Sequence, residues 1–305
     1  MTFRPFTAVV ETVERLSPTF ARITFTGPEL DSFGPAGPVR DLRIKLIFPT
    51  PEAPHPRVAH SGDWYANWRA LPDDQRGAMR TYSVRRLSRD DGRVRLVVDF
   101  VLHLEPGEGG PAAAWAAAAT PRDELTVIGP DLAEPTDAGI EFCPVPGAEV
   151  HLYGDETAAP AIARILEDLP ADAAGCATIE VPCPEDITGI AAPAGVEISW
   201  LPRSGAAHGD LLAGALARRF PGAPGPRRSV DKQTPDAPLI WETPRYSSSG
   251  EAVDPAADGA DAYYWIAGES GMVKQLRRFL VAGAGIDRAQ ISFMGYWRRG
   301  VAMKG

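Results

Sequence analysis

The sequence predicts two domains, an antiparallel β domain followed by an α/β domain built on a parallel sheet. The first 130 residues contain short strand patterns punctuated by Gly and Pro, whereas strand and helix patterns alternate from about residue 146. The length of 305 residues fits about two domains of roughly 150 residues each. We therefore expect a β domain over residues 1–145 and an α/β domain over residues 146–305.

Alternating apolar residues predict the strands of the first domain at residues 7–14, 19–26, 42–48 and 94–102. Short strands at this spacing are typical of an antiparallel barrel or a sandwich. Residues 49–78 form a Pro-rich connection that contains Trp64, Tyr65 and Trp68. Such an aromatic segment is expected to pack and not to act as a simple tether.

The second domain is predicted to contain strands at 149–153, 178–181, 196–201, 262–267 and 290–294, and helices at 157–169, 210–220 and 271–282. This alternation predicts a parallel sheet covered by helices on both faces. Residues 221–260 interrupt the pattern as a Pro-, Gly- and Ser-rich insertion. Its segment 241–246 is consistent with a lid, a dimer contact or an edge hairpin.

Composition excludes several classes of protein. The chain has 31 basic and 40 acidic residues, a net charge of −9, which disfavours nucleic-acid binding. No stretch approaches ~18 uninterrupted apolar residues, so we expect no stable membrane insertion and a soluble, cytoplasmic protein. Its three cysteines show no Cys-x-x-Cys spacing, which predicts reduced, buried thiols and no metal site in the protein.

The first candidate binding motif is the strand segment 80–85. Alternation along a strand places Arg80 and Tyr82 on one face, and Thr81 and Ser83 on the other. A guanidinium, an aromatic ring and hydroxyl groups together suit a flat ligand that carries phosphate. An ordinary exposed strand is the alternative interpretation of these residues alone.

A second candidate motif follows about thirty residues later. The strand ending at His103 leads into a Gly-rich turn, then Pro111 and an Ala-rich run around Trp115. Proline at the first helical position after glycines leaves backbone N–H groups free at the positive end of the helix dipole, where a pyrophosphate can bind. The alternatives are a helix chosen for its propensity and a histidine that only ends a strand.

Together these motifs resemble the Arg-x-Tyr-Ser/Thr flavin motif and pyrophosphate segment of the ferredoxin reductase superfamily. Further segments are similar to the siderophore-interacting protein family of flavin-dependent ferric-siderophore reductases. The matching segments occur in order along the chain at residues 79–85, 98–103, 154–160, 265–269 and 295–300.

The resemblance implies a six-stranded N-terminal barrel that holds FAD and a C-terminal domain that receives NAD(P)H. In the barrel, it assigns Arg80 to the FAD phosphates, Tyr82 to stacking on the isoalloxazine and Ser83 to the vicinity of the reactive flavin nitrogen. The other implied FAD contacts are Thr81 within the motif, Val101 and His103 beside the flavin or its diphosphate, Gly109, Gly110, Pro111 and Ala112 at the pyrophosphate, and Trp115 packed beside them.

In the second domain, the turn at 154–157 lies where open parallel sheets bind ligands, although it lacks a Gly-x-Gly-x-x-Gly fingerprint. We assign the dinucleotide phosphate contact to the backbone from Gly154 and to Thr157. Asp155 and Glu156 would repel a phosphate and are interpreted as helix-capping residues.

Three further groups complete the predicted dinucleotide site. Arg203 and Ser204 suit a ribose 2′-phosphate and favour NADPH over NADH, with a solvated loop arginine as the alternative. Gly268 permits close approach of the nicotinamide, and Glu269 orients it or caps the next helix. The remaining implied contacts are Tyr296 and Trp297, an aromatic pair that the superfamily places near the flavin.

The implied activity is reduction of ferric siderophores by NAD(P)H through FAD, with release of Fe(II). Fe(III) accepts one electron while a nicotinamide delivers two, and a flavin converts between these modes. Lys45, Arg298 and Arg299 are the expected contacts for an anionic siderophore. No side-chain acid or base is required, so no catalytic residue is assigned.

Three other functions remain open from the sequence. The flavoprotein could be a general flavin reductase or a ferredoxin-dependent electron carrier, or it could bind siderophores without enzymatic activity. The sequence specifies neither the siderophore nor the oligomeric state.

Overall fold

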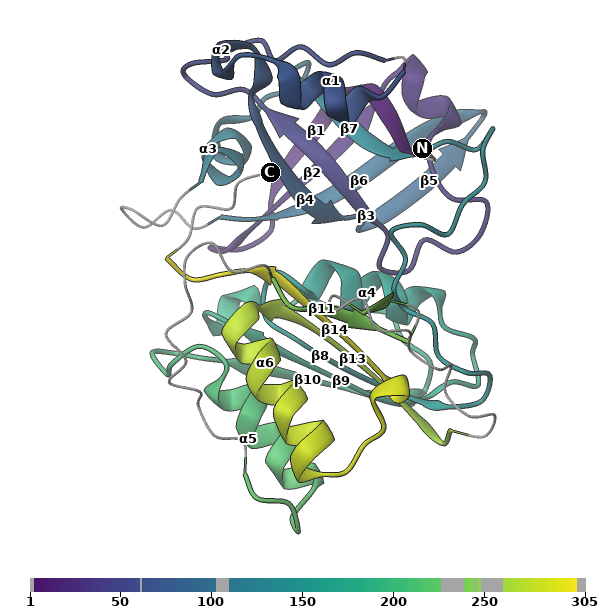
Figure 1. The fold of residues 1–305 in the computed structure, drawn as a ribbon, viewed down its shortest axis with the longest axis vertical. Coiled ribbons are helices and arrows are strands. Elements are labelled where there is room, and N and C mark those ends of the chain that lie inside the picture. Colours follow the sequence, from purple (N-terminus) through teal and green to yellow (C-terminus); the bar gives the residue numbers. More distant parts are fainter. Residues whose placement is uncertain are drawn as a thin grey trace. The chain divides into compact units, whose positions relative to one another are not determined.

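The computed structural model describes residues 3–60, 62–102, 110–225, 239–244, 246–247 and 260–300. The chain forms two compact units, of which the first ends at Ile140 and the second begins at Glu141. The predicted boundary lay slightly later, after residue 145. Each unit contains one sheet, as Figure 1 shows.

The first unit is an antiparallel sheet with the strand order β4-β3-β7-β1-β2-β6-β5. Its strands are β1 (Phe3–Arg15), β2 (Phe20–Thr26), β3 (Arg43–Phe48), β4 (Ala78–Ser83), β5 (Arg86–Asp90), β6 (Arg93–Val101) and β7 (Glu124–Pro130). The predicted strands correspond to β1, β2, β3 and β6, and segment 80–85 begins on β4 as expected. No pattern in the sequence had predicted β5 or β7.

This sheet curls until its two edges are joined by a single run of chain. β4 and β5 lie at opposite ends of the strand order, yet only Val84 and Arg85 separate them. Val84 N–H donates to Leu42 O beside β3, and Arg85 N–H donates to Val97 O on β6, both at 2.9 Å. Counting β4 and β5 as one bent strand, the fold is the six-stranded barrel that the resemblance implied.

Large apolar side chains fill the barrel, and helix α3 (Pro111–Ala118) packs against this core. Fully buried aromatic residues in the core include Phe6, Phe25, Phe33, Phe48 and Phe100. On the α3 side, Ala112 and Ala116 belong to the same core cluster. Small side chains therefore let this helix approach the barrel closely.

The Pro-rich connection at 49–78 is partly helical, with α1 (Trp64–Ala70) and α2 (Asp73–Arg76). Trp64 and Trp68 are buried against Ile47, Met79 and Ile128. Their indole N–H groups donate to the backbone oxygens of residues 3 and 76, at 3.0 and 2.8 Å. The expectation that this segment packs is confirmed. A short 3-10 helix, Pro28–Ser32, lies earlier in the unit.

The second unit is a mixed sheet with the order β10-β9-β8-β13-β14-β11-β12. Its strands are β8 (Glu149–Gly154), β9 (Ala174–Val181), β10 (Gly195–Pro202), β11 (Trp241–Thr243), β12 (Tyr246–Ser247), β13 (Ala262–Glu269) and β14 (Ile291–Trp297). The strands from β10 to β14 in this order are parallel to one another, whereas β11 and β12 are antiparallel additions at one edge. The described part of the insertion is thus an edge hairpin, one of the three predicted alternatives.

Helices cover both faces of this sheet, as predicted. α4 (Ala159–Asp168) lies on one face, and α5 (Asp210–Arg219) and α6 (Ser270–Arg278) lie on the other (Figure 1). α6 continues as a π-helical turn, Phe279–Gly283, and short 3-10 helices occupy Pro184–Asp186 and Arg288–Gln290. The apolar face of α6 is buried through Val273 and Leu276.

The strand order reverses between β8 and β13, because the chain first proceeds from β8 to β9 and β10 and then returns to the other side of β8. Open parallel sheets bind ligands outside the carboxyl ends of their strands at such a point. The turn after Gly154 and the junction from Glu269 into α6 both lie there. The topology therefore predicts a ligand-binding site at this edge of the sheet.

None of the helices in the described ranges is long and apolar enough to cross a membrane. The three cysteines are free thiols, but they are half-buried and not fully buried as predicted.

Candidate functional site

In the first unit, the two predicted binding motifs meet on one aromatic cluster. The Trp115 ring of α3 lies 5.6 Å from the Phe48 ring and 6.0 Å from the Phe100 ring, centroid to centroid. The Tyr82 ring of β4 contacts the same two residues, at 6.1 and 4.7 Å. Segments about thirty positions apart in the sequence therefore lie side by side on the barrel.

Arg80 shares the Tyr82 face of β4, as alternation predicted, because both pair with core residues of β3. Its guanidinium is half-buried and donates to the Met79 carbonyl at 2.8 Å. Burial lowers the pKa of Arg80, and no carboxylate in the described residues pairs with it. A half-buried cation without an acidic partner is suited to an anionic ligand.

Among the described residues, no side chain caps the N-terminus of α3. Gly110 occupies the N-cap position with no capping side chain, and the first turn carries no acidic residue. A Cβ added to Gly110 would meet nothing within 4 Å, so the space around it is unfilled by the described atoms. Free N–H groups at the positive end of a helix suit a phosphate. The start of α3 thus fits the diphosphate of FAD.

The other residues predicted in the barrel have different surroundings. Thr81 is exposed on the opposite face of β4, where its hydroxyl lies 3.3 Å from Lys45 Nζ. Ser83 is buried on that same face, and Val101 is half-buried at the end of β6. Burial, and then the charge of Arg43, lower the pKa of Lys45. The predicted contacts His103 and Gly109 lie outside the described residues.

In the second unit, the carboxylate of Asp155 is the centre of the site at the carboxyl ends of the strands. Asp155 follows β8 and is fully buried. Its Oδ1 accepts hydrogen bonds from the N–H and the hydroxyl of Thr157, at 2.9 and 2.5 Å. Its Oδ2 accepts from the Glu269 N–H at 2.7 Å and from the Trp297 indole N–H at 3.0 Å. One carboxylate thus links the ends of β8, β13 and β14.

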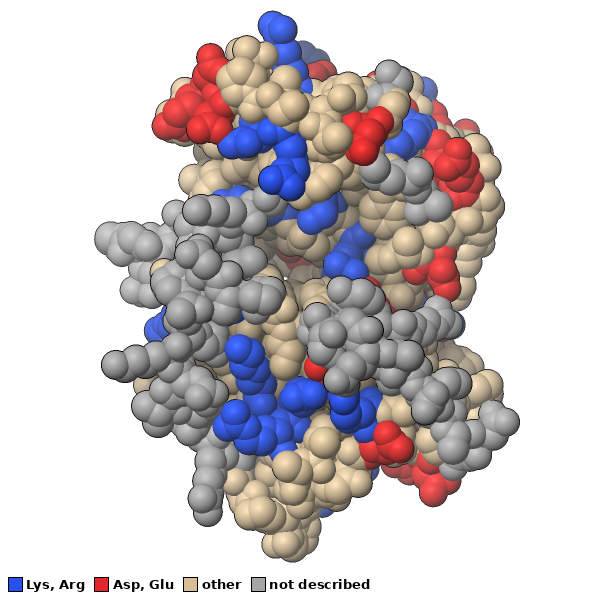
Figure 2. All heavy atoms as spheres, in the orientation of Figure 1, with Lys and Arg blue, Asp and Glu red and all other residues tan. Residues whose placement is uncertain are grey.

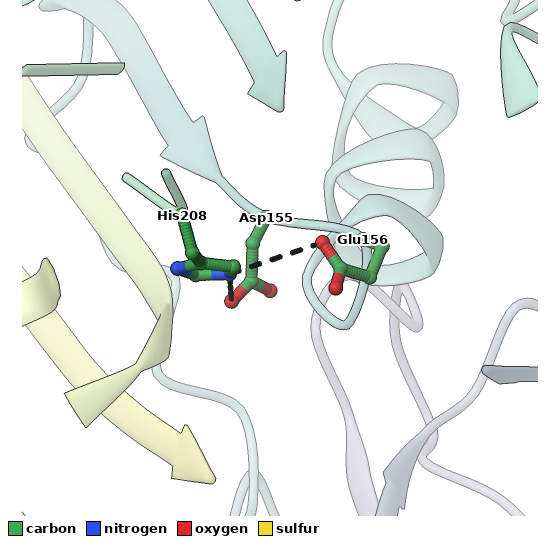
Figure 3. Close-up of side chains that lie close together, drawn as sticks. All are labelled: Asp155, Glu156 and His208. Atoms are coloured by element: carbon green, nitrogen blue, oxygen red, sulfur yellow. Dashed lines mark ion pairs between the residues drawn. The ribbon is translucent and has the colours of Figure 1, made fainter. Parts of the chain in front are cut away.

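His208, in the connection between β10 and α5, completes this arrangement (Figure 3). Its Nε2 lies 3.2 Å from Asp155 Oδ2 and 3.9 Å from Glu156 Oε2. Burial alone would raise the pKa of Asp155, but His208, Thr157 and Trp297 hold it below its usual value. Burial opposes a charge on His208 as well, yet Asp155 and Glu156 raise its pKa overall.

Asp155, Glu156 and His208 offer atoms within 4.8 Å of one another, which is a spacing that a metal ion could use. However, both oxygens of Asp155 already accept hydrogen bonds from protein donors. A cation would have to displace those donors. The group is therefore better described as an internal ion-pair cluster than as a metal site.

Arg203, which the sequence assigned to a ribose 2′-phosphate, belongs to this cluster. Its guanidinium donates to both oxygens of Glu156, at 2.8 and 3.0 Å, and to Glu180 Oε1 at 3.3 Å. Burial disfavours its charge, but Glu156 and Glu180 raise its pKa overall. Two carboxylates thus already pair with Arg203, and its contact with a 2′-phosphate stays a prediction. Ser204 is exposed in the turn that follows, with φ of 48°.

Glycines at two predicted positions are required by packing. At Gly268, φ is +138° and an added Cβ would lie 2.5 Å from the Asp155 carboxyl group. At Gly154, an added Cβ would lie 2.5 Å from Ala158 Cβ. Glu269 caps α6 by accepting from Met272 N–H at 2.9 Å, which is the capping role predicted as its alternative.

The end of the chain carries the remaining predicted residues. The Tyr296 ring stacks on Trp241 of the edge hairpin, with centroids 6.1 Å apart. Arg298 is buried and Arg299 is exposed, with the Arg299 N–H 3.4 Å from Glu269 Oε1. Lys45 belongs to the first unit and these arginines to the second.

Figure 2 shows Lys and Arg side chains gathered over the part of the second unit where α6 lies in Figure 1. The sequence of α6 contains Lys274, Arg277 and Arg278. Basic residues in a last helical turn complement the helix dipole, and Arg277 is also paired with Glu242 at 3.0 Å. Much of this positive charge can therefore be explained by its stabilising effect on α6.

Sequence reasoning missed the roles of Glu180, His208 and, in part, Asp155. Glu180 is fully buried and accepts from the N–H groups of Gly209 and Leu212 at the start of α5, at 2.6 and 3.2 Å. The only available signals were its position at the end of a strand and the placement of His208 just before a helix. Neither signal identifies a partner.

Two family models match the chain. The model described as a siderophore-interacting FAD-binding domain matches residues 9–134, and the one described as a siderophore-interacting protein matches residues 148–300. Each match lies within one structural unit.

Relatives align over nearly the whole chain. An uncharacterised protein of Mycobacterium tuberculosis is 34% identical over 307 residues, covering 98% of this chain and 93% of that protein. The ferric vibriobactin reductase ViuB of Vibrio cholerae is 28% identical over 287 residues, covering 93% and 86%. A solved siderophore utilization protein from T. fusca is 30% identical with a TM-score of 0.71, covering 99% and 95%. Solved ferredoxin reductases share the fold at lower identity.

Proposed function

The chain belongs to the siderophore-interacting protein family, and from that premise we propose that it is an FAD-dependent reductase of ferric siderophores that uses a nicotinamide dinucleotide as electron donor. Its FAD-binding domain and its likeness to a ferric vibriobactin reductase support an oxidoreductase. We further propose that the electron donor is a nicotinamide dinucleotide and that the electrons reduce the iron of a ferric siderophore.

One observation carries the proposal: Tyr82 of β4 and Trp115 of α3 pack on the same two rings, those of Phe48 and Phe100. The shared contacts of Tyr82 and Trp115 bring the two motifs together within the matched FAD-binding domain. Within the described ranges, the Arg80 guanidinium has no acidic partner and Gly110 at the start of α3 has no capping side chain, so both groups are complementary to a diphosphate.

These residues would hold FAD as follows. Arg80 and the backbone at Gly110 and Ala112 bind the phosphates, Tyr82 contacts the ring system, and Trp115 fixes α3 against the barrel. The other proposed FAD contacts are Thr81, Ser83 and Val101, together with His103 and Gly109, which lie outside the described residues. When bound, FAD accepts two electrons as a hydride and returns them singly.

The overall reaction balances with one donor and two iron centres. One NAD(P)H yields NAD(P)⁺, one proton and two electrons, and two Fe(III) chelates each take one electron. Hard oxygen donors hold Fe(III) more tightly than Fe(II), so reduction loosens the metal. Lys45, Arg298 and Arg299 are the proposed contacts for the anionic chelate, and no side-chain proton transfer to iron is needed.

The second unit is proposed to receive the dinucleotide at the edge where the strand order reverses. The backbone from Gly154 to Thr157 and the junction at Gly268 and Glu269 lie at this edge. Tyr296 and Trp297 end the neighbouring strand β14. A nicotinamide donor is a metabolite of the cell interior, which supports the proposed cytoplasmic location.

The test is to purify the holoprotein and measure its bound flavin. Anaerobic addition of NADH or NADPH should bleach the flavin absorbance, and later addition of a ferric siderophore should restore it while a ferrous-specific dye reports Fe(II). Bleaching without Fe(II), but with rapid reduction of free flavins, would indicate a flavin reductase. Reduction only by reduced ferredoxin would indicate the electron-carrier alternative. No reduction by any donor, with siderophore binding, would indicate a binding protein.

A further inference from the structure

We propose that His208 is a positioning residue for the electron donor: its positive charge offsets the carboxylates of Asp155 and Glu156, so that an anionic dinucleotide can bind beside the turn that follows β8. This inference rests on the proposed function and concerns only the binding of the donor. It assigns a task to a residue that no motif had singled out.

The turn after β8 presents an electrostatic problem for such a ligand. Asp155 and Glu156 are adjacent and fully or almost fully buried at the edge where a dinucleotide is proposed to bind. A dinucleotide carries negatively charged phosphates. Charges buried in protein are only weakly screened by salt, so two carboxylates without a counter-charge would repel it.

The geometry shows that His208 is placed to relieve this repulsion. Its Nε2 lies within 4 Å of both carboxylates, at 3.2 and 3.9 Å. The ring is held edge-on against Trp297, with centroids 5.5 Å apart and planes at 88°. Trp297 in turn donates to Asp155. The imidazole therefore has a defined position within 4 Å of both acids, and the dashed lines in Figure 3 mark these two ion pairs.

The other charged groups around the turn do not complete the neutralisation. Arg203 pairs with Glu156, but it also pairs with the fully buried Glu180. The carboxylates of Asp155, Glu156 and Glu180 thus carry three negative charges against one guanidinium, which pairs with only two of them. A proton on His208 reduces the net charge of this cluster from −2 to −1.

The sign of the pH dependence follows from this arrangement. Asp155 and Glu156 raise the pKa of His208 in spite of its burial and of Arg203. The charged form is thus present below the raised pKa and is lost as pH rises through it. We expect dinucleotide affinity to fall over the same range, whereas electron transfer to iron from an enzyme reduced by other means should not follow this titration.

The experiment compares the wild-type holoprotein with His208→Gln and His208→Lys between pH 6 and pH 9. Calorimetry with NAD⁺ gives the dissociation constant without turnover, and anaerobic flavin bleaching gives KM for NADH. Loss of one nearby charge should weaken binding roughly tenfold at an effective dielectric constant near that of protein surfaces. Wild type should weaken with rising pH, His208→Gln should be weak throughout, and His208→Lys should stay tight throughout.

A matched control is His60→Gln, which removes an exposed histidine paired with Glu29 in the first unit. It should keep the wild-type pH profile. Thermal melting checks that each variant folds. If His208→Gln does not fold, the pH series of wild type and of His208→Lys still tests whether the charge of His208 supports dinucleotide binding. A pH-independent dissociation constant in wild type, or equal weakness of the Lys and Gln variants, would overturn the role of His208. If the proposed function itself is wrong, the outcome is distinct: NADH then bleaches the flavin neither in wild type nor in any variant, at any pH.

Discussion

The Arg203 guanidinium donates hydrogen bonds to both carboxylate oxygens of Glu156, at 2.8 and 3.0 Å. This pair leaves little positive charge for a 2′-phosphate, so we expect NADH to be used at least as well as NADPH. The measurement is the ratio of kcat/KM for the two donors in anaerobic flavin reduction. A strong preference for NADPH that disappears in Arg203→Ala would instead identify Arg203 as a phosphate ligand.

The same pair predicts a loss of stability. Removing Arg203 leaves Glu180 buried without its ion-pair partner and Glu156 with only His208 nearby, and breaking a buried ion pair costs about 3 to 5 kcal/mol. Arg203→Ala should therefore lower the free energy of unfolding in denaturant titrations by this order. Arg218→Ala, at an exposed position near the end of α5, is the control and should change it little.

Arg80→Ala should weaken FAD binding. A hydrogen bond to a charged group contributes roughly 1.5 to 3 kcal/mol, which corresponds to about a 10- to 150-fold rise in the dissociation constant. Fluorescence titration of the apoprotein with FAD measures this directly. The control is Arg86→Ala, an exposed arginine of β5. Equal FAD affinity in wild type and Arg80→Ala would refute the phosphate assignment.

Gly268→Ala should destabilise the second unit. Its φ of +138° is unfavourable for any residue with a side chain, and the new Cβ would lie 2.5 Å from the Asp155 carboxyl group. A left-handed backbone alone costs about 1–2 kcal/mol, and displacement of Asp155 adds to this. Thermal and denaturant unfolding measure the effect. At Gly222, where φ is not positive and an added Cβ meets nothing within 4 Å, the Ala variant should be tolerated.

Because the pKa of His151 is lowered, we expect the free energy of unfolding to decline in mild acid. It is buried between Cys176 and Arg219, and burial, with the charge of Arg219, lowers its pKa to about 4. Between pH 6.5 and 4 the unfolded chain takes up a proton that the folded chain does not, so stability falls as pH falls. The loss approaches about 3 kcal/mol at most.

Denaturant titrations at several pH values test this dependence, with His151→Gln as the comparison. The variant should show a shallower slope over that range, because its amide does not titrate. Asp155, whose lowered pKa also removes stability as pH falls, is unchanged in both proteins. Identical slopes would show that His151 is not responsible.

Local patterns predicted much of the fold and the placement of the first motif. Strand alternation correctly put Arg80 and Tyr82 on one face, since side-chain direction depends only on neighbouring backbone. The alternation of strands and helices correctly predicted a parallel sheet with two helical layers. Polar strands such as β5 were missed because they lack an alternating apolar pattern.

Contacts between distant residues could not be predicted in this way. The partners Arg203 and Glu156 are 47 positions apart, and Trp297 and Asp155 are 142 positions apart. An arginine beside a serine suggested a phosphate site because its acidic partner is invisible to spacing. His208 offered no pattern, since its importance comes from the two carboxylates that folding brings to it.

The passage of one run of chain from β4 to β5 also affects how copies of the protein meet. An open antiparallel sheet would expose two rims of unpaired N–H and C=O groups, on which another chain could build. Here Val84 and Arg85 join the two edge strands β4 and β5, and they continue the pairing of β4 at Leu42 and of β5 at Val97. The junction tethers the two edge strands to each other, so a substitution that breaks it should free them and promote aggregation before it affects redox chemistry.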